Sequence, residues 1–355
     1  MRKLGLVALL SLVVPLATIV AAAQQSAPPE FATTAFESYV EFLRQQAGIP
    51  GVSAALVQDG VIVWERGLGM ANLEARVRAT PDTPYPIAEL SQTFASVLLL
   101  QCAELRRLDL DAPAATYGVV LPDAGISLRQ ILSHTAPGIG FQYDPARFAA
   151  LTAAMEYCVR QPYRRSIVHR LLDHVAMIDT VPGRDVVLPG AVPADFFEPP
   201  ALVRYAAVLE RLAVPYRVDA RRRATRAEVP VEGINAATGL VSTVRDLARF
   251  DAALDADLLL RPETRIAAWT PAVSAGESAY PAGLGWFTQL YRGVPVVWHF
   301  GVIPQAYSAL VVKIPSRGAT LILLANSDGL AVPFQLESGD VTRSVFASVF
   351  LRMLL

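Results

Sequence analysis

The sequence has no excess of charge of either sign. Only 18% of its 355 residues are charged, and the formal net charge is −1. The arginines are spread along the chain, so we expect no basic face for nucleic acid and no acidic tail. Because 53% of the residues are hydrophobic, the chain is neither disordered nor fibrous, and it can bury a substantial core.

Cysteine is nearly absent. Cys102 and Cys158 are the only two, and in an oxidising compartment they could form a single disulfide. The alternative is two buried thiols. Both residues lie in stretches with a helical pattern, far apart in the sequence, and nothing in the sequence brings these stretches together. We therefore favour the two thiols.

Long apolar runs are absent beyond the first residues of the chain. Residues 1–23 combine two basic residues, an apolar stretch from Leu4 to Val20 and three alanines. This pattern predicts a secretory signal peptide, and hence a protein exported to the periplasm or out of the cell, with no membrane span after cleavage. An uncleaved membrane anchor is the alternative, because about 20 apolar residues span a bilayer. We favour cleavage, since the polar Gln24 follows the alanines directly.

Hydrophobic periodicity places strands near both ends of the chain. After a polar lead-in over residues 24–30, helical spacing predicts one helix around Phe36–Leu43 and a final helix around Val341–Met353. Runs typical of strands cover residues 52–57, 61–64, 293–299, 306–313 and 320–326. The first two runs are joined by a turn at Asp59-Gly60, which predicts a hairpin.

The middle of the chain is mainly helical in pattern. Residues 91–108 have the pattern of a helix, and Ser127 with Gln130 forms a capping box at the start of another. The whole predicts an α+β fold, in which an antiparallel sheet from both chain ends is flanked by the terminal helices and interrupted by a helical insert. The predicted domain covers residues 31–355, with a sheet part at about 31–85 and 280–355 and a helical part at about 86–279. We expect a cleft where the two parts meet.

Five short sequence motifs, called phrases below, occur in an order and spacing that is also found in a known protein family. They are, in chain order, Pro86–Phe94, Leu108–Pro113, Leu132–Thr135, Gly239–Phe250 and Trp298–Gly301. Together they resemble the serine β-lactamase-like family of penicillin-recognising enzymes, in particular its branch of class C β-lactamases, D-aminopeptidases, carboxypeptidases and esterases. The resemblance covers essentially the whole chain after the predicted signal, and it implies the β-lactamase/transpeptidase-like fold.

The resemblance also implies that the nucleophile has been replaced. In this family a Ser-x-x-Lys pair begins a central helix, and the spacing of one turn brings the amine to the hydroxyl. The matching positions hold Glu89 and Gln92. A carboxylate cannot replace the hydroxyl in forming a stable acyl-enzyme, and an amide cannot accept its proton. Ser91 lies two residues further on, on another face of the helix, and Phe94 rather than lysine follows it by three.

Two further elements of the family are partly kept. The resemblance assigns Tyr143 to a tyrosine that assists proton transfer, and Pro145 to an asparagine whose amide contacts the substrate. Proline has no such amide. The phrase His299-Phe300-Gly301 matches the strand that edges the cleft, where glycine admits a ligand close to the backbone. The predicted catalytic positions are Glu89, Gln92 and Tyr143, and the predicted ligand-binding positions are Pro145, His299, Phe300 and Gly301.

Two classes of function follow. The first is an inactive serine-hydrolase homologue that binds a cell-wall peptide, a β-lactam or an acyl ester in the cleft, or that acts through a protein partner. The second is a hydrolase of β-lactam, peptide or ester substrates that uses a non-standard nucleophile or a water activated by Glu89. We favour the first, because losing the nucleophile typically costs about a millionfold in rate. In this class Glu89 would satisfy free N–H groups at the helix start.

We expect no cofactor and no metal. His169 and His174 are predicted to lie on helix surfaces without the neighbouring ligands of a metal site. His134, in the Ser-His-Thr phrase, is predicted to hydrogen-bond loop backbone beneath the cleft, and Thr243 is predicted to cap a helix with Asp246.

Overall fold

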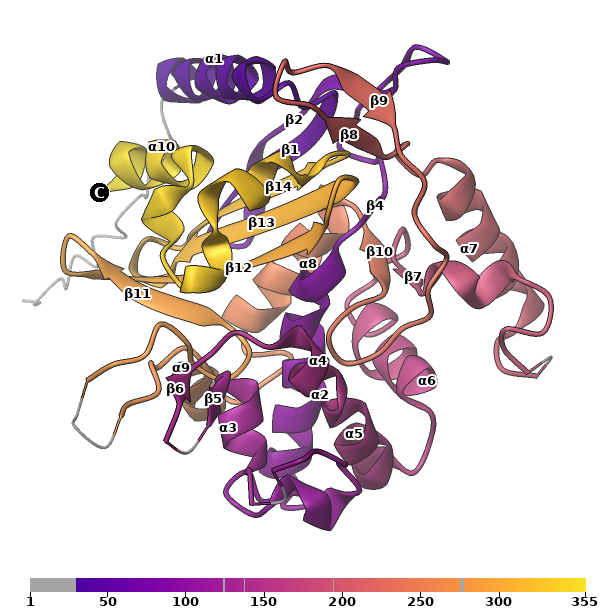
Figure 1. Cartoon of the computed structure of the whole chain (residues 1–355), viewed down its shortest axis with the longest axis vertical. Helices are drawn as coiled ribbons and strands as arrows, with labels where there is room; N and C mark the ends of the chain where they lie inside the picture. The colour runs from indigo at the N-terminus through magenta and orange to yellow at the C-terminus, as the bar shows by residue number, and fades with distance from the viewer. Residues whose placement is uncertain (1–29, 124, 137, 194, 275–277) are drawn as a thin grey trace, which may run out of the picture.

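Strands from both ends of the chain form one seven-stranded antiparallel sheet, as predicted. The computed structural model describes residues 30–123, 125–136, 138–193, 195–274 and 278–355 (Figure 1). The strand order is β11-β12-β13-β14-β1-β2-β3. These strands are β1 (Gly51–Gln58), β2 (Val61–Asn72), β3 (Val77–Arg78), β11 (Phe287–Tyr291), β12 (Val294–Ile303), β13 (Tyr307–Ile314) and β14 (Ala319–Ala325). The N-terminal hairpin β1–β2 pairs with the C-terminal strands through β14, from Val52 opposite Ala325 to Gln58 opposite Ala319.

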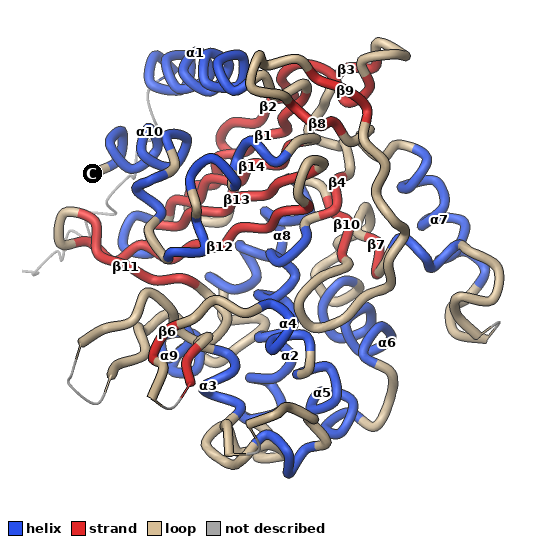
Figure 2. The backbone as a smooth tube through the Cα atoms, in the orientation of Figure 1, coloured by secondary structure: helices blue, strands red, loops and turns tan. Residues whose placement is uncertain are grey.

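Both faces of the sheet are covered, which explains why its central strands are apolar throughout. Leu321 and Leu323 of β14 pack into a core with α1 (Glu30–Ala47) and α10 (Val345–Leu354). The alternate residues Ile322 and Leu324 pack into a second core with the helical part. The terminal helices therefore lie on one side of the sheet and the insert on the other (Figures 1 and 2).

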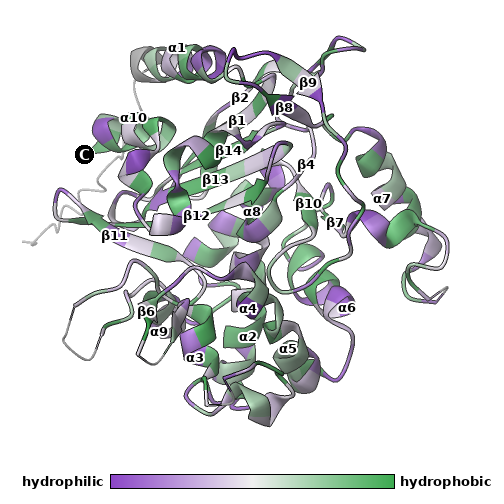
Figure 3. Ribbon diagram, viewed as in Figure 1, coloured by the Kyte–Doolittle hydropathy of each residue, from purple (hydrophilic) through white to green (hydrophobic). Residues whose placement is uncertain are grey.

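The helical part is built around one buried helix. This helix, α2 (Ser91–Glu104), is buried on almost every side and lies among the other helices of the insert. Its ribbon has mainly the hydrophobic colour in Figure 3. The other helices of the insert are α3 (Leu128–Leu132), α4 (Pro145–Ala149), α5 (Leu151–Val159), α6 (Tyr163–Ile167), α7 (Pro199–Glu210), α8 (Val244–Asp255) and α9 (Pro262–Ala268). Two predicted caps are confirmed, because Ser127 and Gln130 form the capping box of α3 and the Thr243 hydroxyl accepts the Asp246 N–H at the start of α8.

Short strands join the insert to the sheet. A three-stranded sheet has the order β4 (Tyr85–Pro86), β10 (Leu240–Ser242) and β7 (Val181–Pro182). Two small hairpins, β5 (Thr135–Ala136) with β6 (Gly140–Phe141) and β8 (Tyr216–Val218) with β9 (Ala224–Arg226), complete the strands. Within the described ranges, no helix has the length and apolarity needed to cross a membrane. The predicted signal peptide lies outside the described residues.

The expectation of two free thiols is wrong. Cys102 near the end of α2 and Cys158 near the end of α5 form a disulfide, with 6.3 Å between their Cα atoms. Packing of α5 against α2 brings the two residues together across 56 positions of sequence. Such a contact between helices is a product of tertiary packing, so neither helical pattern by itself could predict it.

We predict that this disulfide stabilises the helical part. Replacing both cysteines by serine should lower the free energy of unfolding by about 2–4 kcal/mol, because the bridge closes a long loop and restricts the unfolded chain. Urea denaturation of the wild type with and without reductant, beside Cys102→Ser/Cys158→Ser, measures this. Reductant should lower wild-type stability to the level of the variant and leave the variant unchanged. Two free thiols in the denatured, non-reduced wild type would contradict the prediction.

Candidate active site

The start of α2 is fixed between the sheet and the insert. The short 3-10 turn Ala88–Leu90 precedes the helix and lies against β12, where a Cβ at Gly301 would overlap the carbonyl oxygen of Ile87. Glycine at 301 is therefore needed for this close approach. On the other side, the Leu240 carbonyl accepts the N–H of Ile87 at 3.0 Å. Ala88 has a φ of 47°, a left-handed conformation that is costly for a residue with a side chain.

Glu89 projects from this turn toward the end of β12. Its Oε2 atom accepts the backbone N–H of Val302 at 2.8 Å. Burial raises the pKa of the Glu89 carboxyl above its ordinary value, and the nearby Glu232 adds to the rise, while the N–H groups of Val302 and of Glu89 itself oppose it. This contact differs from the role predicted for Glu89, because the carboxylate accepts an N–H of strand β12, while no side-chain cap is formed at the start of the 3-10 turn or of α2.

Gln92 lies one turn further into the helix and is fully buried. Its Oε1 atom is 2.9 Å from Nε2 of His134 and 3.3 Å from Nε2 of His299, and its Nε2 donates to the hydroxyl of Tyr143 at 3.4 Å. The amide therefore joins three of the side chains that the sequence pointed to, from three separate segments of the chain. Each of its polar atoms has a partner, as buried polar groups require.

The two histidines around Gln92 are neutral at neutral pH. Burial lowers the pKa of His134 to about 3, with the charge of His299 as a smaller cause. Burial also lowers the pKa of His299 to about 4, against the opposing effect of the Phe300 carbonyl. Nδ1 of His134 accepts the N–H of Asp144 at 3.1 Å, so Nε2 carries the proton that Gln92 accepts. The predicted contact of His134 with loop backbone is confirmed.

Tyr143 is held by aromatic packing. Its ring centroid lies 4.6 Å from that of His134 and 5.3 Å from those of Phe287 and Phe300. Burial raises the pKa of the Tyr143 hydroxyl well above its ordinary value, and the Glu89 carboxyl adds to the rise. The hydroxyl is therefore protonated at neutral pH. Pro145 is the first residue of α4, behind the N-cap Asp144, and supplies no donor.

A cavity of about 250 Å³ opens beside Glu89. Glu89 is the one predicted site residue that lines it within the described chain. His299 and Phe300 are each only 2% exposed, so their side chains do not reach this space. The rest of the lining comes from both parts of the fold: Pro86, Ala88, Arg184, Val229, Pro230, Glu232, Thr238, Gly239, Leu240, Val302, Ile303 and Pro304.

The sequence reasoning missed three polar residues of this lining, namely Arg184, Glu232 and Thr238. They come from a loop and a short 3-10 turn of the insert, where no periodic pattern identifies a position. The available signal was proximity to Gly239, which begins one of the five phrases and follows Thr238 directly. Val302 could have been inferred in the same way, because it follows Gly301.

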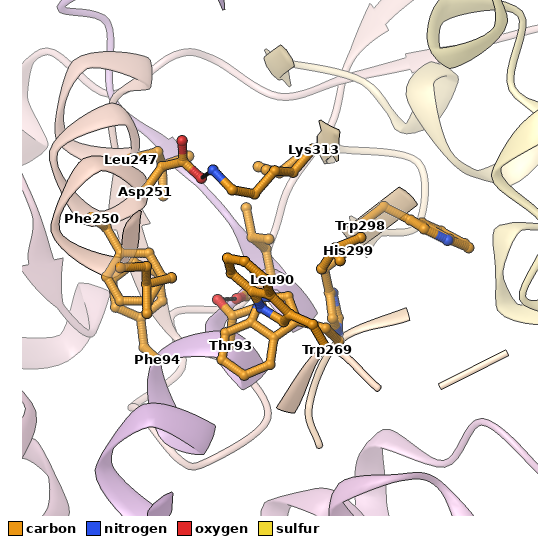
Figure 4. A pocket seen from close by; sticks show the side chains of 14 residues that line it. Leu90, Thr93, Phe94, Leu247, Phe250, Asp251, Trp269, Trp298, His299 and Lys313 are labelled. Atoms are coloured by element: carbon orange, nitrogen blue, oxygen red, sulfur yellow. Dashed lines mark hydrogen bonds and ion pairs between the residues drawn. The ribbon is translucent and has the colours of Figure 1, made fainter. Parts of the chain in front are cut away.

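A second, smaller cavity of about 40 Å³ lies behind the site (Figure 4). His299 and Thr93 line it, whereas Trp298, the neighbour of His299 on β12, points away from it. The buried Lys313 on β13 donates to Asp251 at 2.9 Å and to Asp255 at 2.6 Å on α8. This ion cluster joins α8 to the sheet beneath the catalytic positions of the family. Breaking such a buried pair leaves an uncompensated charge, so the cluster restrains the two layers.

The remaining candidates lie away from the cavity. The hydroxyl of Ser91 is buried and accepts the N–H of Leu240 at 3.3 Å, so it does not stand in for the missing nucleophile. His169 and His174 are exposed, as predicted. Over the ranges that the structure describes, no three histidine, cysteine or acidic side chains are grouped as metal ligands would be.

Comparison with known proteins supports the resemblance drawn from the five phrases. The family model described as Beta-lactamase matches residues 35–341. The human mitochondrial serine beta-lactamase-like protein LACTB is 32% identical over 99 residues, covering 26% of this chain and 18% of that protein. The D-aminopeptidase of Brucella ovis is 27% identical over 186 residues, covering 42% of this chain and 36% of that protein. The matched segments thus span well under half of these relatives.

Solved structures share the fold at low sequence identity. The octameric penicillin-binding protein homologue from Pyrococcus abyssi superposes with a TM-score of 0.72 at 20% identity, over 90% of this chain and 77% of that one. The D-amino acid amidase from Ochrobactrum anthropi SV3 superposes with a TM-score of 0.68 at 20% identity, over 91% and 98%. The predicted β-lactamase/transpeptidase-like fold is confirmed.

We predict that the buried histidines weaken the fold in acid. The pKa of His299 is about 4 when folded and about 6.5 when unfolded, so the unfolded chain binds the extra proton between these values and stability falls as the pH is lowered through them. From about pH 6.5 to 4.5, the wild type should lose about 2 kcal/mol more unfolding free energy than His299→Gln. Urea denaturation at the two pH values measures this. His174→Gln, an exposed control, should behave like the wild type, and equal losses in all three proteins would contradict the prediction.

Proposed function

The chain belongs to the β-lactamase family, and we propose that it is a catalytically inactive, exported member that binds a ligand in the cleft beside Glu89 without forming an acyl-enzyme. The observation that carries the proposal is the contact between Glu89 Oε2 and the N–H of Val302. A carboxylate stands where the family has its nucleophile. It also occupies a backbone donor that would otherwise face the cavity.

Gln92 supports the same proposal from the other catalytic position. Its amide accepts the Nε2–H of His134 and donates to the Tyr143 hydroxyl, and an amide has no basic nitrogen that could take a proton from a nucleophile. The surrounding groups favour a neutral residue, because both histidines have a lowered pKa and the site is buried. Both polar atoms of the buried Gln92 amide thus have hydrogen-bond partners without a lysine at this position.

A ligand site is the use that remains for the cavity. Its volume of about 250 Å³ and its mixed lining, with Glu89, Glu232, Arg184 and Thr238 among apolar residues, suit part of a small molecule or a short peptide. We keep cell-wall peptides, β-lactams and acyl esters as ligand classes, since these are the substrates of the family's branches. Export, proposed from residues 1–23, would place the protein where such cell-wall peptides occur.

One observation favours a second candidate, a hydrolase in which Glu89 activates water. The carboxyl has a raised pKa, as a general base needs, and it lines an accessible cavity. The Val302 N–H opposes this role, because it stabilises the ionised form and fixes one carboxylate oxygen. We therefore rank this candidate second.

We predict that the family's acylation chemistry can be restored. Glu89→Ser/Gln92→Lys should label slowly with a fluorescent penicillin at residue 89, because the two groups then lie one helical turn apart and the lysine reaches the vicinity of Tyr143. Adding Pro145→Asn should speed labelling, since misplacement of a substrate by about 1 Å can cost on the order of a hundredfold. Intact-mass spectrometry over time measures the adduct.

The controls for this series are the wild type and Glu89→Ser alone, each first shown to be folded by its melting curve. The wild type should form no adduct, and Glu89→Ser should label far more slowly than the double variant because its serine lacks a proton acceptor. A stoichiometric adduct on the wild type would contradict the inactive assignment. A folded triple variant that labels no faster than the wild type would contradict the assignment of residues 89, 92 and 145.

We predict binding without turnover. A muropeptide, β-lactam or acyl ester that fits the cleft should raise the melting temperature. At a ligand concentration of 100 times Kd, the free energy of unfolding should rise by about 2.7 kcal/mol. Thr238→Arg, which fills the cavity, should abolish the shift. Chromogenic β-lactam and nitrophenyl ester should be hydrolysed no faster than in buffer. A hydrolysis rate that is lost in Glu89→Gln at unchanged melting temperature, and kept in Glu232→Gln, would establish the hydrolase instead.

A further inference from the structure

Two hairpins that are distant in sequence meet at one corner of the fold. One is the turn between β2 and β3, and the other is β8–β9 (Figures 1 and 2). Tyr216 of β8 pins them together, because its hydroxyl accepts the N–H of Leu73 at 2.7 Å and donates to the Glu74 carboxylate. The hairpin turn is also joined to α1, where Arg222 donates to Gln46 at 2.8 Å. The corner is therefore held as a fixed surface.

This corner is strongly basic, contrary to the expectation drawn from the even spread of arginines. Seven arginines lie on residues 73–78 and 216–226, against two carboxylates, Glu74 and Asp219, so these segments carry a formal charge of +5. The whole chain carries −1, so all other residues together carry −6. The seven exposed arginines, named here the arginine corner, are Arg76, Arg78, Arg217, Arg221, Arg222, Arg223 and Arg226.

Most of this charge is not used within the molecule. Asp219 pairs with Arg223 at 2.7 Å and accepts the backbone N–H of Arg221, which fixes the turn. Across the described ranges, six of the seven have no ion-pair partner within 4 Å, namely Arg76, Arg78, Arg217, Arg221, Arg222 and Arg226, although Arg222 donates to the neutral Gln46. A cluster of free, exposed guanidinium groups repels itself unless an anionic partner neutralises it.

Apolar side chains stand out between the charges. Val77 is 52% exposed and lies between Arg76 and Arg78, and Leu73 at the start of the same turn is 38% exposed. The turn projects from the body of the fold, and Figure 3 shows mainly hydrophilic colour there. An apolar residue on a protruding turn, surrounded by basic residues, is the arrangement of surfaces that enter the headgroup region of a bilayer. A bilayer offers an apolar boundary that Val77 can enter between the contacts of its neighbouring arginines with phosphate, whereas a soluble polyanion offers only the phosphates.

We infer that the arginine corner, with Val77 and Leu73, docks the protein on an anionic lipid bilayer. The arginines would contact lipid phosphates, and Val77 would enter the boundary between headgroups and acyl chains. Strand β9 leads within four residues to Val229 and Pro230, which line the cavity beside Glu89. Docking would therefore hold this cleft close to the membrane surface.

Vesicle co-sedimentation of the full-length chain tests the inference. Vesicles of phosphatidylcholine with about one third phosphatidylglycerol should bind the protein at low salt, and phosphatidylcholine alone should bind it far less, because basic residues near an anionic surface each add to binding. Raised salt should release it. Insertion of an uncleaved N-terminal segment would bind both kinds of vesicle and is not reversed by salt, so the quantity compared is the bound fraction that raised salt releases.

The decisive variant is Arg217→Ser/Arg221→Ser/Arg226→Ser, which removes three arginines without ion pairs. It should weaken binding to the anionic vesicles on the order of a hundredfold. The matched control, Arg106→Ser/Arg107→Ser/Arg292→Ser, removes the same charge from exposed positions elsewhere and should bind like the wild type. Equal salt-released binding by the two variants would overturn the inference, as would a wild type whose salt-released binding is the same on anionic and neutral vesicles.

A further variant separates a bilayer from a soluble polyanion. Val77→Ser should weaken binding to the anionic vesicles severalfold, since it removes one apolar side chain from the lipid boundary. If Val77→Ser bound vesicles like the wild type, and if a DNA duplex competed fully with the vesicles for the wild type, the corner would be a polyanion site and the bilayer assignment would be wrong. Melting curves for every variant ensure that each is folded.

Discussion

The contact between the start of α2 and strand β12 determines where every other part of the site lies. Gly301 allows the turn before the helix to approach the strand, and β10 holds the same turn from the side of the insert through Ile87 and Leu240. Glu89 and Gln92 then lie one helical turn apart, and their side chains reach different partners. Glu89 reaches the Val302 N–H at the rim of the cavity, and Gln92 reaches the buried histidines. A larger residue at 301 would separate the layers, and both sets of hydrogen bonds would be lost.

The polar groups around the start of α2 match Glu89 and Gln92 better than the serine and lysine that the family has at these positions. A lysine at position 92 would place a charge beside two histidines whose pKa values burial has lowered, whereas the neutral amide accepts the Nε2–H of His134 and donates to the Tyr143 hydroxyl. A serine at 89 would leave the Val302 N–H facing the cavity, whereas the carboxylate accepts it. The fold does bury one lysine, Lys313, but there two carboxylates, Asp251 and Asp255, accept its hydrogen bonds and balance its charge.

The insert contributes both of the surfaces that we assign to function. Its residues 227–240 run from the β8–β9 hairpin to the cavity, so the arginine corner and the cleft are two ends of one segment. The sheet contributes the other part of each surface, namely the β2–β3 turn at the arginine corner and Val302 at the cavity. Ligand binding and membrane docking would thus involve the two ends of one segment, although they depend on different chemistry and can be removed separately.

The sequence alone determined five strands of the main sheet, the terminal helices, the caps at Ser127 and Thr243, and the family, because hydrophobic periodicity and short motifs are local properties of the chain. It also identified Glu89 and Gln92, since their positions are defined by spacing within one helix. It missed the edge strands β3 and β11 and the second half of β2. Tertiary structure decided the features that depend on distance in space. It joined Cys102 to Cys158, buried His299 behind the cavity and gathered arginines from separated segments into one corner. No local pattern carries such information, because each of these contacts depends on how whole elements pack.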